Sequence, residues 1–345
     1  IGETIDLAIR VTNKKPLPLN HLEVEDDIPK ELEVQGVKMQ LSRRADTLNL
    51  RHSASMGWYE RITWNYKVRC NARGYYSLGP VTIRSGDLFG FRESSTQLPQ
   101  IDRIIVYPRT VPLPHVRLPA GRPFGEMRGG EPIFEDPTRI MGLRDYRHND
   151  PLKRVDWKAT ARRQALQVKV FEPSVTHQLL ILLNLDTIGK TWEGYDSVLL
   201  ERAVTAAASA ARLAFEEKHT VGLYANGASL TSNQHIRVPL SRDPRQLNII
   251  LEALAMAGPF VHYSMEDIIR REGRFFPFGS TIVLVTALMP EPLASSLLYL
   301  HGEGYPVVVL SVANERFGTD LRGIPVYELG PYLRDLEVMG FGVAG

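Results

Sequence analysis

The spacing of apolar residues changes once along the chain, and this change limits the possible folds more than any other feature. Residues 1–107 alternate between polar and apolar side chains in short runs such as TIDLAIRVTN, separated by Gly, Pro, Asn or Asp. Period-two alternation is typical of strands with one buried face, and short strands at this spacing form antiparallel sandwiches. We therefore expect an N-terminal antiparallel β-sandwich, immunoglobulin-like in kind, over residues 1–108.

From about residue 174 the apolar residues are continuous instead of alternating. The runs HQLLILLNLD and STIVLVTAL are typical of strands that are buried on both faces of a parallel sheet. Between them lie stretches with apolar residues at helical spacing, such as YDSVLLERAVTAAASAARLAFEEKH. Alternating strands and helices predict a doubly wound α/β domain over residues 173–345, with any ligand site at the carboxyl ends of the strands.

Two segments separate these domains. Residues 109–142 are rich in Pro and Gly and show neither period, so we expect a linker that lies along the surface as a strap. Residues 143–172 form a basic block. In this block Asp150 is expected to cap a short helix that starts at Pro151 and ends near Trp157. A turn and a strand, ALQVKVFE, should follow.

Composition narrows the classes of function. A chain of 345 residues with 43% hydrophobic residues can bury a sizeable core, and a net charge of +2 does not favour nucleic acid as a general partner. The single cysteine, Cys70, excludes an internal disulfide and is expected to be a packed thiol in a strand. No apolar run is long enough to span a membrane. The chain begins in a strand at Ile1, as a trimmed protein would, and we expect this chain itself to be soluble.

The stretch from Tyr146 to Glu172 holds seven Lys or Arg residues against three acids. Two interpretations remain open. In the first, the block forms the junction between the two domains, and Asp156 and Trp157, flanked by Arg154 and Lys158, form a fixed ion-pair network around a buried indole. In the second, the basic side chains contact an anion or a protein partner. The candidate contact residues are Arg144, Arg147, Arg154, Lys158, Arg162 and Arg163.

A nucleic-acid interface would require exposed aromatic residues among the basic ones. The available aromatic residues, Tyr146, Trp157 and Phe171, have the spacing of buried side chains. An anion or nucleic-acid binder that uses residues 147–163 therefore remains an alternative and not the first choice.

The end of the first α/β strand resembles a degenerate metal site. In von Willebrand factor A-type domains an Asp-x-Ser-x-Ser motif at this position holds a divalent cation through oxygen ligands. Here Asp186 is followed by Ile188 and Lys190 in the two Ser positions, and Ala287 or Leu288 stands where a later Asp is expected. We expect no metal and no cofactor, although a metal-dependent ligand binder or hydrolase at Asp186 remains an alternative. No phosphate-binding loop, nucleophile elbow or zinc motif is present in the sequence, so we expect no enzyme.

The basic block resembles the hallmark of the bacterial and archaeal domain-of-unknown-function 58 (DUF58) family. That hallmark runs approximately Arg-x-Tyr-x-x-Gly-Asp-x-x-Arg-x-Ile-Asp-Trp-Lys-x-x-Ala-Arg, with an acid in the next strand. The matching residues are Arg144, Tyr146, Asn149, Asp150, Arg154, Val155, Asp156, Trp157, Lys158, Ala161, Arg162 and Glu172. Of these, Tyr146, Asp150, Asp156, Trp157 and Glu172 are the expected structural signature.

The resemblance implies a β-sandwich-like segment followed by a von Willebrand factor A-like domain. It also implies two membrane helices near the N-terminus of full-length members, with the remaining portion in the cytoplasm. Genes of the family commonly lie beside genes for MoxR-type AAA+ ATPases. The resemblance therefore implies a non-enzymatic scaffold that works with such an ATPase.

Overall fold

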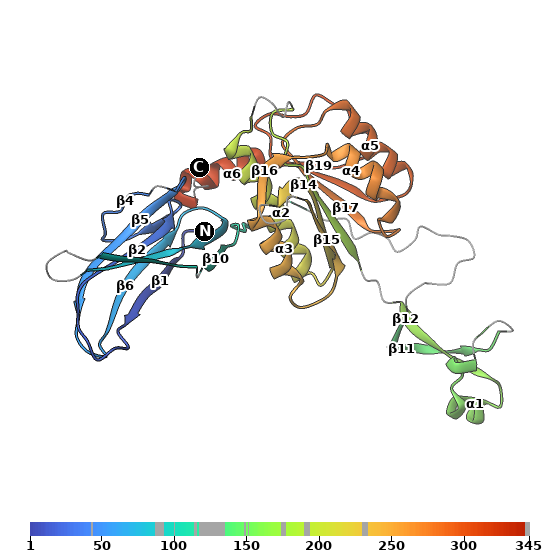
Figure 1. Cartoon of the computed structure of the whole chain (residues 1–345). Coiled ribbons are helices and arrows are strands. Elements are labelled where there is room, and N and C mark those ends of the chain that lie inside the picture. Colours follow the sequence, from blue (N-terminus) through green and yellow to red (C-terminus); the bar gives the residue numbers. More distant parts are fainter. Residues whose placement is uncertain are drawn as a thin grey trace.

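A computed structural model gives the fold, and Figure 1 shows its elements. It describes residues 1–42, 44–86, 93–99, 101–113, 116, 135–147, 150, 152–173, 177–189, 194–229 and 234–341. Most of the expected linker, residues 117–134, lies outside this range, as do His148, Asn149, Pro151 and Lys190. None of the helices in the described part is long and apolar enough to cross a lipid bilayer.

The N-terminal β-rich part consists of three antiparallel sheets, with strand orders β1-β6-β3, β4-β5-β2-β8-β9 and β10-β7. The alternation seen in the sequence places every second side chain of β1 and β6 toward the interior. The strands are β1 (Thr4–Thr12), β2 (Leu19–Pro29), β3 (Leu32–Val34), β4 (Gln40–Leu41), β5 (Thr47–Met56), β6 (Arg61–Cys70), β7 (Gly74–Leu78), β8 (Val81–Gly86), β9 (Glu93–Leu98) and β10 (Asp102–Val106).

The sheets of the β-rich part share one core. Ile28 of β2 and Leu50 of β5 pack in the same cluster as Val68 of β6, so side chains from two sheets meet. Cys70 is buried at the end of β6 and forms no disulfide, which confirms the expectation of a packed thiol. The antiparallel, β-rich character predicted for this half of the chain is also confirmed.

The C-terminal α/β part is built on a seven-stranded mixed sheet in the order β15-β14-β13-β17-β18-β19, with β16 beside β14. β13, β14, β17, β18 and β19 run parallel, whereas β15 and β16 are antiparallel to β14. The strands are β13 (Gln178–Leu183), β14 (Thr220–Ser229), β15 (His235–Ser241), β16 (Ala257–Val261), β17 (Thr281–Thr286), β18 (Val307–Ser311) and β19 (Val326–Glu328).

Helices cover both faces of this sheet (Figure 1). They are α2 (Ser197–Glu216), α3 (Gln246–Ala255), α4 (Met265–Glu272), α5 (Glu291–Gly302) and α6 (Gly330–Leu336), with short turns η3 (Gly273–Phe275) and η4 (Glu337–Phe341). Leu179, Ile181 and Leu183 of β13 face α2 and α3, while Leu180 and Leu182 face α4 and α5. A strand whose side chains are buried on both faces explains the continuous apolar run in the sequence.

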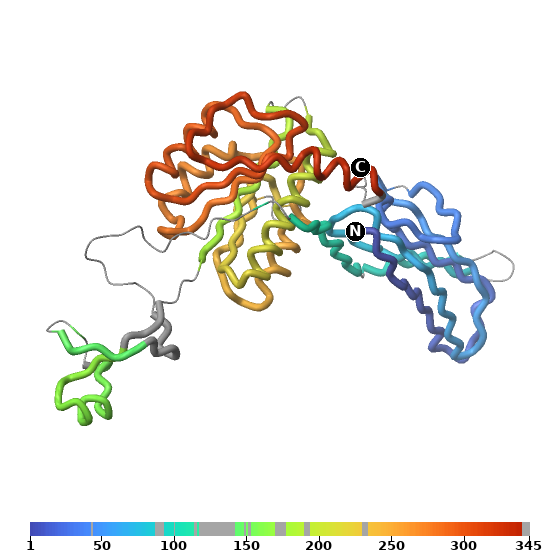
Figure 2. Tube along the Cα trace, turned by 180° about the vertical axis from the view of Figure 1, so that it is seen from behind, coloured from blue at the N-terminus to red at the C-terminus, as the bar shows by residue number. Residues whose placement is uncertain are grey.

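A third unit, which we call the arm, comprises residues 135–173. It contains β11 (Glu135–Asp145), η1 (Leu152–Arg154), α1 (Trp157–Arg163) and β12 (Gln167–Pro173), and β11 pairs antiparallel with β12. In both views the arm lies apart from the two larger parts (Figures 1 and 2). β11 begins at Glu135, inside residues 109–142, where we expected a linker without regular structure. Its backbone pairs with β12 through two register shifts, and no apolar period in the sequence marks this strand.

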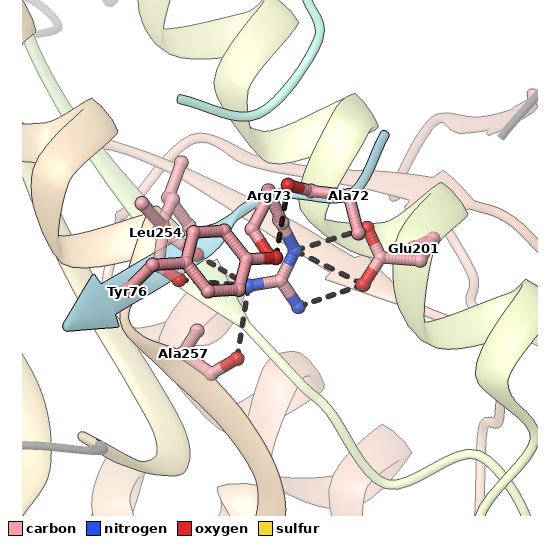
Figure 3. Close-up of polar contacts among 7 residues, drawn as sticks. Ala72, Arg73, Tyr76, Glu201, Leu254 and Ala257 are labelled. Carbon is pink, nitrogen blue, oxygen red and sulfur yellow. Dashed lines mark hydrogen bonds and ion pairs between the residues drawn. The ribbon is translucent and has the colours of Figure 1, made fainter. Parts of the chain in front are cut away.

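The β-rich part is joined to the α/β part by a buried arginine (Figure 3). Nε of Arg73 lies 3.0 Å from both carboxylate oxygens of Glu201 on α2, and Nη2 lies 2.9 Å from Oε1. Nη1 donates to the carbonyl of Leu254 in the last turn of α3 at 2.7 Å and to that of Ala257, just after the helix, at 2.9 Å. The side chain of Arg73 is only 6% exposed, so one residue satisfies a carboxylate and two carbonyls across the contact.

The chain between β10 and the arm adds further contacts of the same kind. The backbone N–H of Val111 donates to Ser209 Oγ at 2.9 Å, and Tyr332 Oη donates to the carbonyl of Pro112 at 2.9 Å. Leu113 and Val116 pack in the core of the α/β part. This stretch is therefore fixed to α2 and α6. The contacts between the two large parts come from here and from Arg73, whereas we expected the basic block to form that junction.

Candidate functional site

The arm folds around the cap of its short helix. Asp156 has an extended backbone, and its Oδ1 accepts hydrogen bonds from the N–H groups of Lys158 and Ala159, both at 3.0 Å. An Asp that satisfies the first free N–H groups of a helix fixes where the helix begins. The predicted helix that ends near Trp157 is therefore wrong: α1 starts at Trp157, and only the 3-10 turn η1 precedes it.

A second aspartate holds the turn between β11 and η1. Asp150 accepts two hydrogen bonds from the guanidinium of Arg144, both at 2.6 Å, and a third from the N–H of Arg147 at 2.7 Å. The hydrogen bonds from Arg144 and Arg147 lower the pKa of Asp150 to about 2. Arg144, expected as a partner contact, is thus engaged inside the arm.

The centre of the arm is Gln167, which the sequence did not identify. Its side chain is fully buried and donates through Nε2 to Asp145 Oδ1 at 2.6 Å. Its backbone N–H donates to Thr160 Oγ1 at 3.0 Å, and its carbonyl accepts from the N–H of Asp156 at 2.9 Å. Gln167 therefore ties β11, α1 and β12 together. In the run ALQVKVFE, Leu166 has the same phase as the buried Val168, yet Leu166 is 41% exposed and Gln167 is buried.

Trp157 is 66% exposed, so the interpretation of a buried indole is wrong. It occupies the first position of a seven-residue helix that buries none of its own residues. Five of its seven residues are exposed, and Ala159 and Thr160 are half-buried toward Gln167. Lys158 and Arg162 are also exposed, and at four residues apart they lie on the same side of the helix.

The charges exposed on the arm are unbalanced. Within its described residues, Asp145 accepts from Gln167, Asp150 binds Arg144, and Asp156 caps α1 with Lys169 Nζ 3.8 Å away. The described structure contains no ion pair to Lys158 or Arg162. We define the arm surface as Trp157, Lys158 and Arg162 on α1, together with the exposed side chains of Arg147 and Lys153 in the segment before α1.

The remaining predicted residues lie around this surface. Arg163 is exposed and reaches Gln167 Oε1 at 3.4 Å, while Arg154 is half-buried. Tyr146 is half-buried, and its N–H donates to the carbonyl of Leu166 at 2.9 Å. Glu172 belongs to β12, but its side chain lies outside the described part. The structure thus brings the predicted contact residues into one unit of the chain.

In the described part of the chain, the carboxylate of Asp186 is engaged by its own loop. Its Oδ1 accepts from the N–H of Gly189 at 2.9 Å and from the N–H of Ile188 at 3.3 Å, so the carboxylate caps its own loop. Ile188 contributes no oxygen, and the buried methyl group of Ala287 lies just after β17. Among the described residues no group of three His, Cys, Asp or Glu side chains is placed to hold a metal. These residues do not fit a divalent cation, which requires several oxygen ligands.

Three other polar side chains cross the sheet at this edge. Asn184 Nδ2 donates to Thr286 Oγ1 at 3.0 Å, and Asn226 Nδ2 donates to Asn184 Oδ1 at 2.7 Å. All three are at most 4% exposed; Asn184 follows β13, Thr286 ends β17 and Asn226 lies within β14. Their mutual hydrogen bonds tie the ends of β13 and β17 to β14. The sequence offered a signal for them, since each is a polar residue within an apolar run.

A shallow hollow of about 570 Å³ lies near the start of α2, lined by Asp196, Val198, Leu199, Arg202, Asn314, Glu315 and Arg334. Its buried cation is already paired. Arg202 donates to both oxygens of Glu337, at 2.7 and 2.6 Å, and to Asn314 Oδ1 at 2.9 Å. This contact joins α2 to the C-terminal helical turns.

Comparison with known proteins supports the resemblance of the basic block. A family model described as "Protein of unknown function DUF58" matches residues 142–316, just over half of the chain. An uncharacterized protein of Bacillus subtilis (strain 168), YeaD, is 24% identical over 322 residues, which cover 91% of this chain and 73% of YeaD.

A crystal structure of the GH20 exo-β-N-acetylglucosaminidase from Vibrio harveyi, in complex with N-acetylglucosamine, also aligns with 92% of this chain and 66% of the enzyme. The sequence identity is 11% and the TM-score is 0.22, so this likeness carries no argument about fold or activity. The matched residues cover most of the arm, where the hallmark residues lie, and most of the α/β part. This chain belongs to the DUF58 family.

Proposed function

We propose that this chain is a non-enzymatic protein-interaction module whose arm surface contacts a protein partner. The observation that carries the proposal is the 66% exposure of Trp157 beside Lys158 and Arg162, while the described carboxylates of the arm are used internally. Trp and Arg dominate binding energy at protein interfaces, and an exposed cationic surface selects an acidic partner.

We further propose that the partner is a MoxR-type AAA+ ATPase and that the full-length protein is tethered to the cytoplasmic side of a membrane. Both statements follow from the resemblance to the family. The contacts of Arg73 with Glu201 support a scaffold role, because they hold the two large parts together while the arm lies apart from them.

The finer domain identities are also proposals. The strand order β15-β14-β13-β17-β18-β19, with one antiparallel edge strand, supports a von Willebrand factor A-like domain over residues 173–345. The antiparallel sheets with a shared core support an immunoglobulin-like sandwich over residues 1–108. Residues 109–142 would then be a linker, and residues 143–172 the signature block.

A pull-down with the cognate ATPase tests the contact. Replacing Arg154, Lys158 and Arg162 together by Ala is expected to abolish capture, because it removes positive charge from the arm. The matched control replaces Lys14, Lys15 and Lys38, three exposed lysines of the β-rich part, by Ala. Capture that is equal for both triple variants would reject the arm as the contact.

A second candidate function is binding of a polyanion such as nucleic acid. The exposed indole of Trp157 beside basic side chains favours it, since bases stack on aromatic rings within cationic grooves. Binding of this kind falls steeply with salt. Single-stranded nucleic acid that binds at low salt, and is lost with Trp157→Ala, would support this candidate over the protein contact.

A further inference from the structure

Residues 270–279, RREGRFFPFG, connect α4 to β17, and we call them the aromatic turn. Phe276 is 4% exposed and packs into the core, whereas Phe275 and Phe278 on either side of it are 56% and 62% exposed. The aromatic turn therefore presents two large apolar rings to solvent. These residues do not line the hollow near the start of α2.

Hydrogen bonds and ring packing hold the aromatic turn in place. The ring of Phe276 meets Tyr224 edge to face with centroids 5.6 Å apart, and Tyr305 Oη donates to the carbonyl of Phe276 at 3.0 Å. Ser280 Oγ donates to the carbonyl of Pro277 at 2.7 Å. The backbone is thus anchored at Phe276 and Pro277, between the two exposed rings, which therefore require little ordering on binding.

A guanidinium group lies over one of the exposed rings, since Cζ of Arg274 is 4.7 Å from the centroid of Phe275. The ring of Phe278 meets Tyr305 edge to face at 6.0 Å, and Cζ of Arg271 lies 4.5 Å from the centroid of Tyr263, which precedes α4. Neither of these two arginines forms an ion pair with any described residue. The nearby acids are engaged, since Asp267 pairs with Arg270 at 3.4 Å and Glu272 pairs with Arg237 at 3.1 Å.

We propose that the aromatic turn contacts the interfacial region of an anionic lipid bilayer. Aromatic side chains favour the headgroup level of membranes, and guanidinium groups are attracted to anionic headgroups. The turn exposes two rings, whereas a stable protein interface buries about 800 Å² of each partner and seats its anchors in pockets. A flat bilayer accepts short projecting side chains without such a pocket.

The position of the turn fits this contact. α4, which leads into it, lies on the side of the α/β part away from the N-terminal sheets in both views (Figures 1 and 2). A few rings and cations give weak, reversible membrane binding, so the turn would orient a protein rather than anchor it alone. This inference uses residues that the proposed protein contact does not use and does not depend on it.

Flotation with vesicles tests the proposal. The chain is expected to float with phosphatidylcholine vesicles that contain about one-third phosphatidylserine, and far less with phosphatidylcholine alone. Replacing Phe275 and Phe278 together by Ser should lower the bound fraction on anionic vesicles roughly tenfold. The double change Arg271→Gln and Arg274→Gln should lower it to a similar degree and remove its dependence on phosphatidylserine.

Two controls separate the turn from other surfaces. Trp58→Ser changes a side chain that is 68% exposed on the β-rich part, and it should leave flotation unchanged. The double change Lys158→Ala and Arg162→Ala removes charge from the arm surface. In that background, Phe275→Ser with Phe278→Ser should still lower the bound fraction by the same factor. Circular dichroism of each variant should match that of the unaltered chain, because the altered side chains are exposed.

The proposal is overturned if the unaltered chain does not float with anionic vesicles. It is also overturned if the double phenylalanine variant floats as well as the unaltered chain. If the unaltered chain binds no vesicles but captures a protein that the double phenylalanine variant does not capture, the turn is a protein interface instead.

Discussion

The guanidinium of Arg73 and the carboxylate of Glu201 meet across the contact between the β-rich and α/β parts, with Nη2 and Oε1 2.9 Å apart. Both side chains are largely buried, at 6% and 19% exposure. Removing one member of such a pair leaves the other charge without its partner in a poorly solvated place. Together with the contacts of residues 111–116, this pair holds the two parts in their relative position.

Arg73→Ala is expected to destabilise the contact by about 3 kcal/mol, because it leaves Glu201 and the carbonyls of Leu254 and Ala257 unsatisfied. Urea denaturation followed by fluorescence should show one unfolding transition for the unaltered chain and two for Arg73→Ala. Arg316→Ala, which removes an exposed pair with Glu328, is the matched control and should change little. Identical unfolding curves for Arg73→Ala and the unaltered chain would show that the contact contributes nothing.

Asp26 makes the stability of the β-rich part depend on pH. It is 6% exposed in β2, and burial, followed by the charges of Asp27 and Asp102, raises its pKa to about 6. Between the ordinary pKa of 3.8 and 6 the folded chain binds more protons than the unfolded chain. This group therefore lowers the free energy of unfolding as pH rises through that window.

Asp26→Asn is accordingly expected to stabilise the chain at pH near 7.5 by on the order of 2 kcal/mol and to have little effect near pH 4. Urea denaturation at both pH values measures this difference. Equal effects of the substitution at the two pH values would contradict the linkage.

The pKa shift of Asp150 is opposite in direction to that of Asp26. Its pKa is lowered to about 2 by hydrogen bonds from Arg144 and Arg147, so its contribution to the arm is present above its ordinary pKa and is lost as pH falls through 2. Asp150→Asn should therefore speed exchange of the Arg147 amide hydrogen at neutral pH, while amides of β13 stay unchanged. Protection of Arg147 that survives this substitution would mean that Asp150 does not hold the turn.

Asp186 is predicted to support its loop and not a cation. Titration calorimetry with Mg²⁺ or Mn²⁺ should show no saturable binding. Asp186→Ala should lower the free energy of unfolding by about 1 kcal/mol, because the N–H groups of Ile188 and Gly189 lose their acceptor. Asp186→Asn keeps an acceptor oxygen and should cost less. Saturable Mg²⁺ binding that disappears with Asp186→Ala would overturn this view.

The sequence predicted those elements in which the burial of each face stays the same along the whole element. The alternation in β1 and the continuous apolar run of β13 were interpreted correctly, because burial on one or both faces leaves a period in the sequence. Within the arm the prediction failed for Trp157 and Gln167. A small unit buries only some of its apolar positions, so hydrogen bonds of Asp156 and Gln167 decide its fold instead.

The contact through Arg73 could not be predicted at all. Its partners Glu201, Leu254 and Ala257 lie 128 to 184 residues away in the chain, and no local pattern records such a pairing. The metal prediction rested on side-chain chemistry that the sequence already contains. The side chains of Ile188 and Ala287 hold no oxygen, and the carboxylate of Asp186 accepts hydrogen bonds from its own loop.

The central claim is that the arm surface binds a protein partner, and the affinity of a charge-reversed arm tests it most directly. The double change Trp157→Ala and Lys158→Glu is expected to weaken binding of the cognate MoxR-type ATPase at least tenfold, since it removes the aromatic anchor and reverses a charge. Its unfolding midpoint should match that of the unaltered chain, because both side chains are exposed. The control, Trp58→Ala with Lys15→Glu on the β-rich part, should bind as the unaltered chain does. A double arm variant that binds with unchanged affinity would contradict the account.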